Sequence, residues 1–238
     1  MTIITAWTLV AFSFSGAFAQ EWERVLEKDG IVVYERQRSN APVRDFRAEM
    51  VIDSSPLSVM ALMDDTEAAP RWFTHCRRLV RVSEISSDEH IVYNITRFPW
   101  PMRDRDAVLR SVRRFEKENK RFVIDYRSVD NISCPPAEPG LSRVVTIEGQ
   151  WGVTALGRDR TLVTSRIQMD LGTPLPGWTL NPFLREATYQ TFVNIRQVVQ
   201  EPKYRNAMPT PEYMQRFGVS GNPAVGRPLS AGDLRISR

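Results

Sequence analysis

The chain is poor in the residues that most catalytic and metal sites need. Its 238 residues include two cysteines, Cys76 and Cys134, and two histidines, His75 and His90. A zinc site needs three or four cysteine, histidine or carboxylate ligands in one cluster, and these side chains are too scattered to form one. The motifs of serine hydrolases, zinc peptidases, phosphate-binding loops and dinucleotide-binding folds do not occur. We therefore expect no metal, no cofactor and no catalytic residue.

His75 and Cys76 are adjacent, which raises the question of a nucleophile and its base. Neighbouring side chains on a strand point to opposite faces, so the two cannot form a dyad there. On a turn they would be able to approach, but the surrounding residues indicate a connection between a helix and a strand. His90 lies beside two acidic residues and is expected to be a solvated turn histidine. A disulfide between Cys76 and Cys134 stays open, because the sequence does not give the distance between their Cα atoms.

Basic residues are in excess only at the C-terminal end of the chain. The formal net charge is +4, and residues 203–238 alone hold six basic and two acidic side chains. A nucleic-acid-binding domain carries its basic surface on the folded part, so we expect no nucleic-acid partner. Residues 208–238 also contain prolines and glycines with little apolar periodicity, which predicts a disordered tail.

Beyond residue 19 the sequence has no apolar run long enough to cross a membrane. The run from Met1 to Ala19 ends in Ala17-Phe18-Ala19, an A-x-A cleavage pattern, and polar residues follow it. We interpret residues 1–19 as a secretory signal peptide, although no Lys or Arg lies near its start. The competing interpretation is an uncleaved membrane anchor, since about 18 apolar residues can span a bilayer. Cleavage near Ala19 predicts an exported protein, secreted or periplasmic.

Residues 20–207 have the pattern of an antiparallel sheet followed by one long helix. Strand-like alternation is expected over 31–34, 46–52, 78–85, 90–97, 106–115, 122–129, 142–153 and 161–169. Mostly short turns join these segments, so the strands should form an antiparallel meander. Short helices are expected over 21–29, after Ser54-Ser55-Pro56, and over 67–74.

The long helix is expected to begin at Asn181, with Pro182 in its first turn, and to end at Glu201-Pro202. Its apolar residues recur at spacings of three and four, so one face should cover the sheet. A sheet covered by a single helix is an α+β fold. A strongly curved sheet of this kind tends to leave a cavity under the helix.

Three stretches carry a family resemblance. In the first, Val92 to Asp106, the bend Phe98-Pro99-Trp100-Pro101 interrupts the strand pattern and an Arg-Asp repeat opens the next strand. The second is Gly172 to Asn181, and the third is Asp29 to Tyr34. Together they resemble the START family, the steroidogenic acute regulatory-related lipid-transfer domains, and the first looks most like the phosphatidylcholine-transfer branch.

The resemblance covers residues 21–202 and implies a helix-grip (START / Bet v 1-like) fold with a tunnel for one lipid. It implies a START-like domain over 20–207 that binds and carries a lipid, a sterol-like compound or another apolar small molecule, and that contacts membranes transiently. The terminal helix would act as a lid hinged at Gly172 and Gly177. The alternative is a helix-grip enzyme of the cyclase or aromatase type acting on an apolar substrate, with polar groups from Tyr93, Asn94, Thr96 and Arg110.

Candidate cavity residues are aromatic or polar side chains near the bend and one face of the long helix. They are Trp72, Tyr93, Asn94, Thr96, Trp100, Arg110, Ser111, Trp151, Trp178, Leu184, Thr188, Thr191 and Ile195. Some sterol-binding members of the family carry a buried acid and an arginine near the positions of Asn94 and Ser111, so neutral groups would replace that ion pair here. Ala107 stands where an aromatic residue often follows the Arg-Asp pair, so a choline head group is not implied. The Arg-Asp repeat itself is expected to be an ion-pair network that pins the corner.

Overall fold

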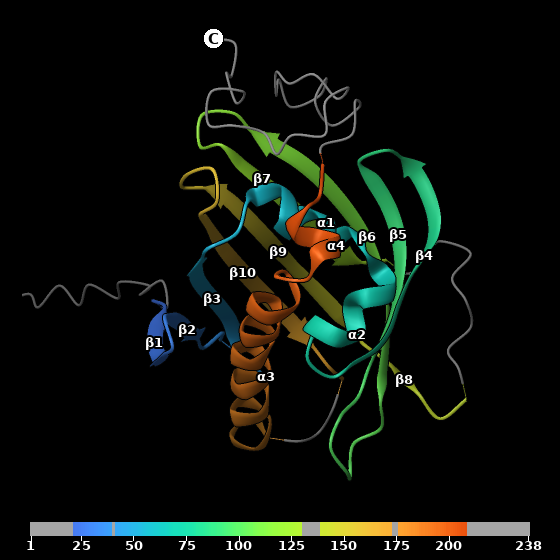
Figure 1. The fold of residues 1–238 in the computed structure, drawn as a ribbon. Coiled ribbons are helices and arrows are strands. Elements are labelled where there is room, and N and C mark those ends of the chain that lie inside the picture. Colours follow the sequence, from blue (N-terminus) through green and yellow to red (C-terminus); the bar gives the residue numbers. More distant parts are fainter. Residues whose placement is uncertain (1–20, 40, 130–138, 173–175, 209–238) are drawn as a thin grey trace, which may run out of the picture.

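A curved sheet with a long helix along its open side forms the body of the protein (Figure 1). The computed structural model describes residues 21–39, 41–129, 139–172 and 176–208. The sheet has ten strands in the order β1-β2-β3-β10-β9-β7-β6-β5-β4, and β8 pairs with β6 in parallel. The predicted signal peptide, Cys134 and the predicted tail from residue 209 onward lie outside the described residues.

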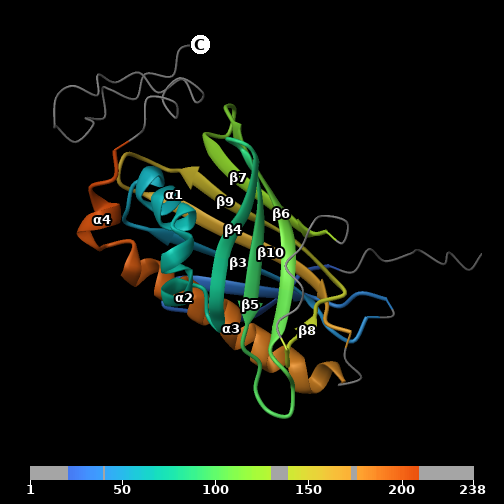
Figure 2. The same cartoon turned by 90° about the vertical axis from the view of Figure 1, so that its right-hand side faces the viewer.

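The strands are β1 (Glu23–Lys28), β2 (Ile31–Arg36), β3 (Asp45–Ile52), β4 (Cys76–Ser86), β5 (Glu89–Thr96), β6 (Arg105–Glu116), β7 (Arg121–Ser128), β8 (Ser142–Arg143), β9 (Thr146–Ala155) and β10 (Thr161–Asp170). The helices are α1 (Pro56–Asp64), the 3₁₀ turn η1 (Thr66–Ala68), α2 (Ala69–Trp72), α3 (Gly177–Val198) and α4 (Pro202–Arg205). Figure 2 shows α3 passing beneath the sheet, with α1, α2 and α4 gathered at one end.

The prediction of a helix over residues 21–29 is wrong, because this segment forms strand β1. Trp22, Val25 and Leu26 fit a helical spacing, but the Asp29-Gly30 pair turns the chain back onto β2. Both residues have a positive φ, 53° for Asp29 and 70° for Gly30. A two-residue hairpin of this kind favours Asp-Gly, so the local turn chemistry overrides the apolar spacing.

The predicted strand over residues 142–153 is two strands. Val144 N–H donates to the carbonyl of Asp106 (2.9 Å), whereas Val145 N–H donates to that of Asp170 (3.0 Å). The chain therefore crosses from β6 to β10 between these two residues, and β9 then pairs with β10 and β7. The other predicted strands are present with bounds shifted by a few residues.

The helices largely follow their capping signals. Ser55 Oγ accepts a hydrogen bond from the backbone N–H of Ser58 (3.1 Å) at the start of α1, as predicted. Helix α3 begins at Gly177, four residues before the predicted cap Asn181. A Cβ at Gly177 would lie 1.9 Å from the carbonyl oxygen of Pro42, so only glycine allows this approach. Among the described residues, no helix combines the length and apolarity that spanning a bilayer requires.

Polar contacts fasten α3 at several points along its length. Glu35 of β2 is fully buried and accepts hydrogen bonds from Arg185 of α3 (2.6 Å) and from Arg44 (2.8 Å). Farther along, Thr191 Oγ1 accepts from the backbone N–H of Thr74 (3.1 Å). The helix is thus held on both sides of the space that it covers.

Candidate functional site: a cavity between the sheet and α3

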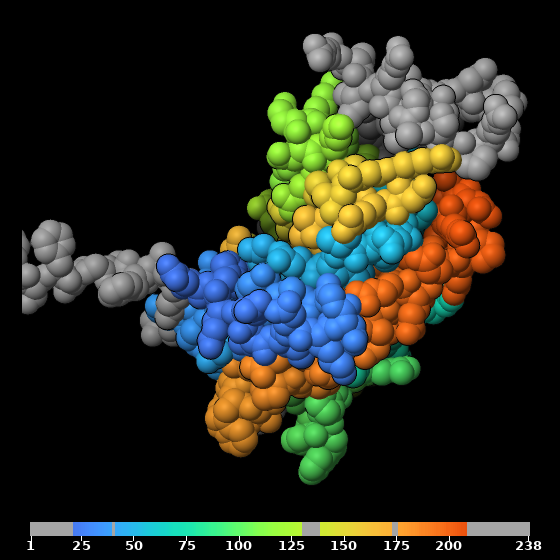
Figure 3. All heavy atoms as spheres, turned by 60° about the vertical axis from the view of Figure 1, so that its left-hand side comes forward, coloured from blue at the N-terminus to red at the C-terminus, as the bar shows by residue number. Residues whose placement is uncertain are grey.

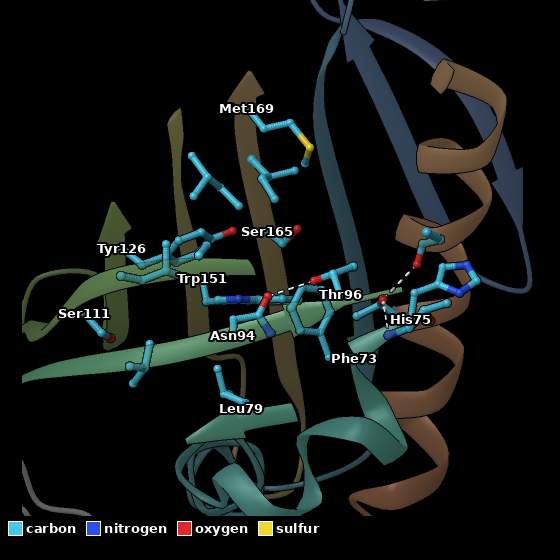
Figure 4. Close-up of a pocket in the computed structure, with 18 of the residues that line it drawn as sticks. Phe73, His75, Leu79, Asn94, Thr96, Ser111, Tyr126, Trp151, Ser165 and Met169 are labelled. Atoms are coloured by element: carbon cyan, nitrogen blue, oxygen red, sulfur yellow. Dashed lines mark hydrogen bonds between the residues drawn. The ribbon is translucent and has the colours of Figure 1, made fainter. Parts of the chain in front are cut away.

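A largely apolar cavity of about 210 Å³ lies between the inner face of the sheet and α3. Strand alternation selects its wall. On β5 the even-numbered residues from His90 to Thr96 face the cavity, and on β6 the odd-numbered residues from Arg105 to Arg113 do so. Helix α3 contributes residues from Phe183 to Phe192, spaced three and four apart. Figure 4 shows side chains from several strands converging on this space.

The centre of the wall is aromatic and aliphatic. Trp151 of β9 packs edge-on against Trp72 of α2 (5.9 Å between ring centroids) and lies beside Phe192 of α3 (5.8 Å). Tyr126 of β7 also reaches the cavity, and Gly149 opposite it on β9 makes this possible: a Cβ there would lie 2.3 Å from the tyrosine hydroxyl. Burial raises the pKa of the Tyr126 hydroxyl, which stays neutral.

At the end of the cavity beside the β5–β6 turn, here called the loop end, three rings in the wall pack together. His75 stacks on Phe183 (4.6 Å between centroids), and Phe98 lies against the same ring (5.6 Å). These residues come from the α2–β4 connection, from α3 and from the turn after β5. Burial lowers the pKa of His75, with a further contribution from Arg97, which favours the neutral ring. Three separate segments therefore meet where the cavity ends.

A short polar strip runs along β5 and β6 towards the loop end. Thr96 Oγ1 donates to Asn94 Oδ1 (2.8 Å), a bond drawn in Figure 4. Asn94 Nδ2 in turn donates to the carbonyl of Arg78 (3.3 Å). Arg105 lies directly opposite Thr96 in the strand register and is 6% exposed. Hydrogen-bonding groups thus follow β5 and β6 towards the loop end of a mainly apolar wall.

The opposite end, here called the α1 end, is ionic. Asp64 at the end of α1 forms an ion pair with Arg113 of β6, and His90 and Arg81 complete this part of the wall. Burial raises the pKa of Asp64, while Arg113 and Arg81 oppose the shift. His90 is 7% exposed rather than solvated as predicted, because it belongs to β5 and faces inward. Burial lowers its pKa, with help from Arg81 and Arg113.

The outer face of β5 and β6 carries a different network. Asp106 is 1% exposed and accepts two hydrogen bonds from Arg143 (2.9 and 2.8 Å) and one from the hydroxyl of Tyr93 (3.0 Å). Asp104 accepts a hydrogen bond from the backbone N–H of Phe98 (3.2 Å) and so holds the turn. The two acids of the Arg-Asp repeat therefore pin this corner, as predicted. Arg105 between them takes no part.

The structure brings eight of the predicted site residues together on the cavity wall. They are Trp72, Asn94, Thr96, Ser111, Trp151, Leu184, Thr188 and Thr191. Asn94 and Ser111 do not approach each other. Ser111 pairs with His90, four residues along β5 from Asn94, or roughly 13 Å at about 3.3 Å per residue.

Five predicted site residues do not line the cavity. Tyr93 and Arg110 each neighbour a lining residue on a strand, and alternation turns them to the outer face, where Arg110 pairs with Glu89 (2.6 Å). Ile195 is on the inner side of α3 but is fully buried in the core beyond the cavity. Trp100 and Trp178 point into solvent and are 92% and 80% exposed.

The strongest chemical groups of the wall were missed by sequence reasoning. Arg105, Arg113 and Asp64 all line the cavity. The sequence places Arg105 in the expected corner network and predicts no role for Arg113 or Asp64. Odd-numbered alternation along β6 was the available signal for the two arginines. Asp64 gave no such signal, because its position depends on how α1 packs on the sheet.

The described residues of this site do not pair a nucleophile with an activating base. Burial raises the pKa of the Cys76 thiol to about 11, and its sulfur lies 3.5 Å from Asn94 Nδ2. His75 has a positive φ of 64° and its ring stacks on Phe183, away from any dyad with Cys76. Within the described part of the chain, no cluster of three histidine, cysteine, aspartate or glutamate residues is arranged to hold a metal ion.

Comparisons with known proteins agree with this architecture. The family model described as START domain matches residues 16–205. An uncharacterized protein of Pseudomonas aeruginosa is 25% identical over 202 residues, covering 84% of this chain and 96% of that protein. The phosphatidylcholine transfer protein of Mus musculus is 23% identical over 170 residues, covering 68% of this chain and 75% of that protein. A solved STAR-related lipid transfer protein from Xanthomonas axonopodis has a TM-score of 0.68 at 22% identity, covering 76% of this chain and 99% of that one. The predicted helix-grip fold is confirmed.

Proposed function

Because the chain belongs to the START domain family, we propose that it binds one lipid between the sheet and α3 and carries it without changing it chemically. The observation that supports this most is the wall itself, which is mainly apolar. Its charged groups lie at the two ends, and elsewhere isolated hydroxyl groups such as those of Ser165, Thr188 and Thr191 interrupt the apolar lining. Burial of apolar ligand surface is favourable by roughly 25 cal/mol per Å² before the costs of association. Such a wall therefore retains an acyl chain without any reacting group.

Loading requires the walls to move apart. A volume of about 210 Å³ is below the roughly 300–1000 Å³ of typical ligand pockets, so we infer that the cavity widens when a lipid enters. The three rings at the loop end come from different segments, which makes this the place to open. We propose that α3 acts as the lid. Gly172, with a positive φ of 58°, lies in the connection before it, whereas Gly177 serves close packing against Pro42.

The loop end also carries the features expected of a membrane contact. Trp100 in the β5–β6 turn and Trp178 in the first turn of α3 are almost fully exposed. Figures 1 and 3 show that this turn and the start of α3 project from the same end of the molecule. Tryptophan side chains settle at the boundary between lipid and water, because one part of the ring is apolar and the other donates a hydrogen bond. We propose that this end touches a membrane when the lipid enters or leaves.

Export remains a proposal that rests on the sequence of residues 1–19. It predicts that the protein recovered outside the cytoplasm begins at Gln20. N-terminal sequencing checks this. A chain recovered intact from Met1 in the membrane fraction would support the anchor instead.

A vesicle assay tests the carrier function. Donor vesicles contain a fluorescent phospholipid, acceptor vesicles do not, and the rate of fluorescence transfer is measured with and without protein. Ala107→Trp places a large ring at a position that faces the cavity and should lower the rate about tenfold. Leu156→Trp, on the exposed β9–β10 turn, is the matched control and should transfer at the wild-type rate. Equal rates for wild type, Ala107→Trp and buffer alone would contradict the proposal.

A further inference from the structure

One buried charge in the cavity wall has no ionic partner among the residues that the structure describes. Arg105 is the first residue of β6, faces the cavity and is 6% exposed. Its Nε atom forms no hydrogen bond, and no carboxylate of the described residues pairs with its guanidinium. The ring of Phe98, 5.8 Å from the guanidinium carbon, is the contact that the structure gives it. Neither neighbour compensates the charge, because the Asp104 carboxylate bonds the turn and the Asp106 carboxylate accepts hydrogen bonds from Arg143 and Tyr93.

Three other deeply buried charges in the described part of the chain are compensated. Glu35 has two arginine partners, and Asp45 pairs with Arg36 (2.6 Å). Asp106 has Arg143 (2.8 Å). An uncompensated charge taken out of water costs several kcal/mol, and proteins retain one mainly where a ligand or a reaction needs it. Arg105 therefore differs from Glu35, Asp45 and Asp106 in lacking an oppositely charged partner.

The surroundings of Arg105 also define the ligand group. Thr96 and Asn94 are already bonded to each other and to the backbone, which leaves the guanidinium as the free donor of the strip. A guanidinium stays charged and presents parallel N–H groups that match the two oxygens of a carboxylate or a phosphodiester. Among the described residues of the loop end, no carboxylate is left for a cationic head group, because Asp104 and Asp106 are both engaged. A single anionic group fits this chemistry.

We propose that Arg105 binds the anionic oxygen group of the carried lipid, a carboxylate or a phosphodiester, at the loop end of the cavity. This rests on the proposed carrier function and adds the class of lipid. The acyl chain then extends along β6 over Ala107 and Leu109 towards Arg113. Arg113 lies eight positions after Arg105 on the strand, roughly 26 Å at about 3.3 Å per residue, which is room for one extended chain.

The test is a competition between ligands that differ only in charge. Purified full-length protein is incubated with equimolar oleic acid and oleyl alcohol, and separately with dioleoylphosphatidylglycerol and dioleoylglycerol. Native mass spectrometry measures the ratio of the two bound forms. The wild type should prefer the anionic member of at least one pair by about tenfold or more, as expected for hydrogen bonds to a charged group. The pair that shows the preference identifies the carboxylate or the phosphodiester.

Arg105→Met keeps an unbranched, flexible side chain and removes the guanidinium with its charge. This variant should bind the neutral ligand at least as well as wild type and lose the preference for the anion. Its melting temperature without lipid should not fall, because an uncompensated buried charge has been removed; a purely structural arginine would predict a fall. Arg110→Gln, on the outer face of the same strand, is the matched control and should keep the preference.

The outcomes separate the two proposals. If the wild type binds both members of each pair equally, the carrier function stands and the role of Arg105 is wrong. If Arg105→Met retains the preference, the role of Arg105 is also wrong. If neither wild type nor variants bind any of the four ligands, the carrier function itself is contradicted, and the inference falls with it.

Discussion

Arg105 and Asp106 are neighbours on one strand, both are buried, and their surroundings are opposite. Asp106 faces outward into a closed set of hydrogen bonds from Arg143 and Tyr93. Arg105 faces inward onto the cavity, without a carboxylate partner among the described residues. Because successive side chains on a strand point to opposite faces, the Asp106 carboxylate bonds side chains of the outer face, whereas the Arg105 guanidinium faces the cavity.

The difference distinguishes charged residues that stabilise the fold from charged residues that are available to a ligand. Ionic groups satisfied by the protein belong to its stability, because removing one partner leaves the other uncompensated. A buried charge that the protein leaves unsatisfied lowers stability and is available to a ligand. The outer face of β6 should therefore respond to mutation in stability, and the inner face in lipid binding.

The largest effect is expected at Asp106. Asp106→Ala removes three hydrogen bonds to a fully buried carboxylate and should lower the free energy of unfolding by about 3 kcal/mol. Urea titration followed by tryptophan fluorescence measures this loss. The preference between anionic and neutral lipid should be unchanged in the folded fraction. A loss below about 0.5 kcal/mol, or a changed preference, would break the division between the two faces.

A smaller effect is expected at the rings that pack together at the loop end. Phe183→Ala removes the ring that His75 and Phe98 both contact, so the cavity should open more readily. We expect the rate at which bound fluorescent lipid leaves for acceptor vesicles to rise several-fold. Phe115→Ala, which removes a partner of Phe122 away from this cluster, is the control. An unchanged rate in Phe183→Ala would place the opening elsewhere.

The smallest effect concerns His90 and its dependence on pH. Asp64 from α1, Arg81 and Glu84 from β4, and Arg113 from β6 surround it, and burial is the main cause of its lowered pKa. The unfolded chain then takes up a proton below about pH 6.5 more readily than the folded one, so stability falls as the pH drops below that value.

His90→Gln should flatten this fall in stability. Thermal unfolding of wild type and variant from pH 7.5 to pH 5 measures it, and equal slopes would show that the α1 end does not hold a neutral histidine. A flattened fall would mean that folding at the α1 end disfavours the charged form of His90.

Much of the fold was predictable, because strand alternation and the Ser55-Pro56 cap are local signals. Errors arose where two local signals competed. Trp22, Val25 and Leu26 suggested a helix, although Asp29-Gly30 was a hairpin signal. The sequence predicts Asn181 as the helix cap, but Asn181 lies inside α3. Its side-chain oxygen accepts a hydrogen bond from the backbone N–H of Arg44 (3.1 Å).

The site was predictable only in part, because it depends on which face each strand turns inward. The predicted cavity residues include two pairs of strand neighbours, Tyr93 with Asn94 and Arg110 with Ser111. Because successive side chains on a strand point to opposite faces, only one member of each pair can face the cavity. The role of Arg105 was hidden for another reason. The alternating charges of the Arg-Asp repeat suggested mutual pairing, and the registers of β5, β6 and β8 are needed to show that the acids are engaged elsewhere.

The central claim is that the space between the sheet and α3 carries one lipid. Native mass spectrometry of the protein purified from its source, without added detergent, tests it most directly. We predict a single adduct at a ratio of one lipid per chain, which organic extraction releases as an intact acyl lipid with an anionic group. A protein that shows only the mass of the bare chain, with Ala107→Trp no different from wild type, would contradict the account.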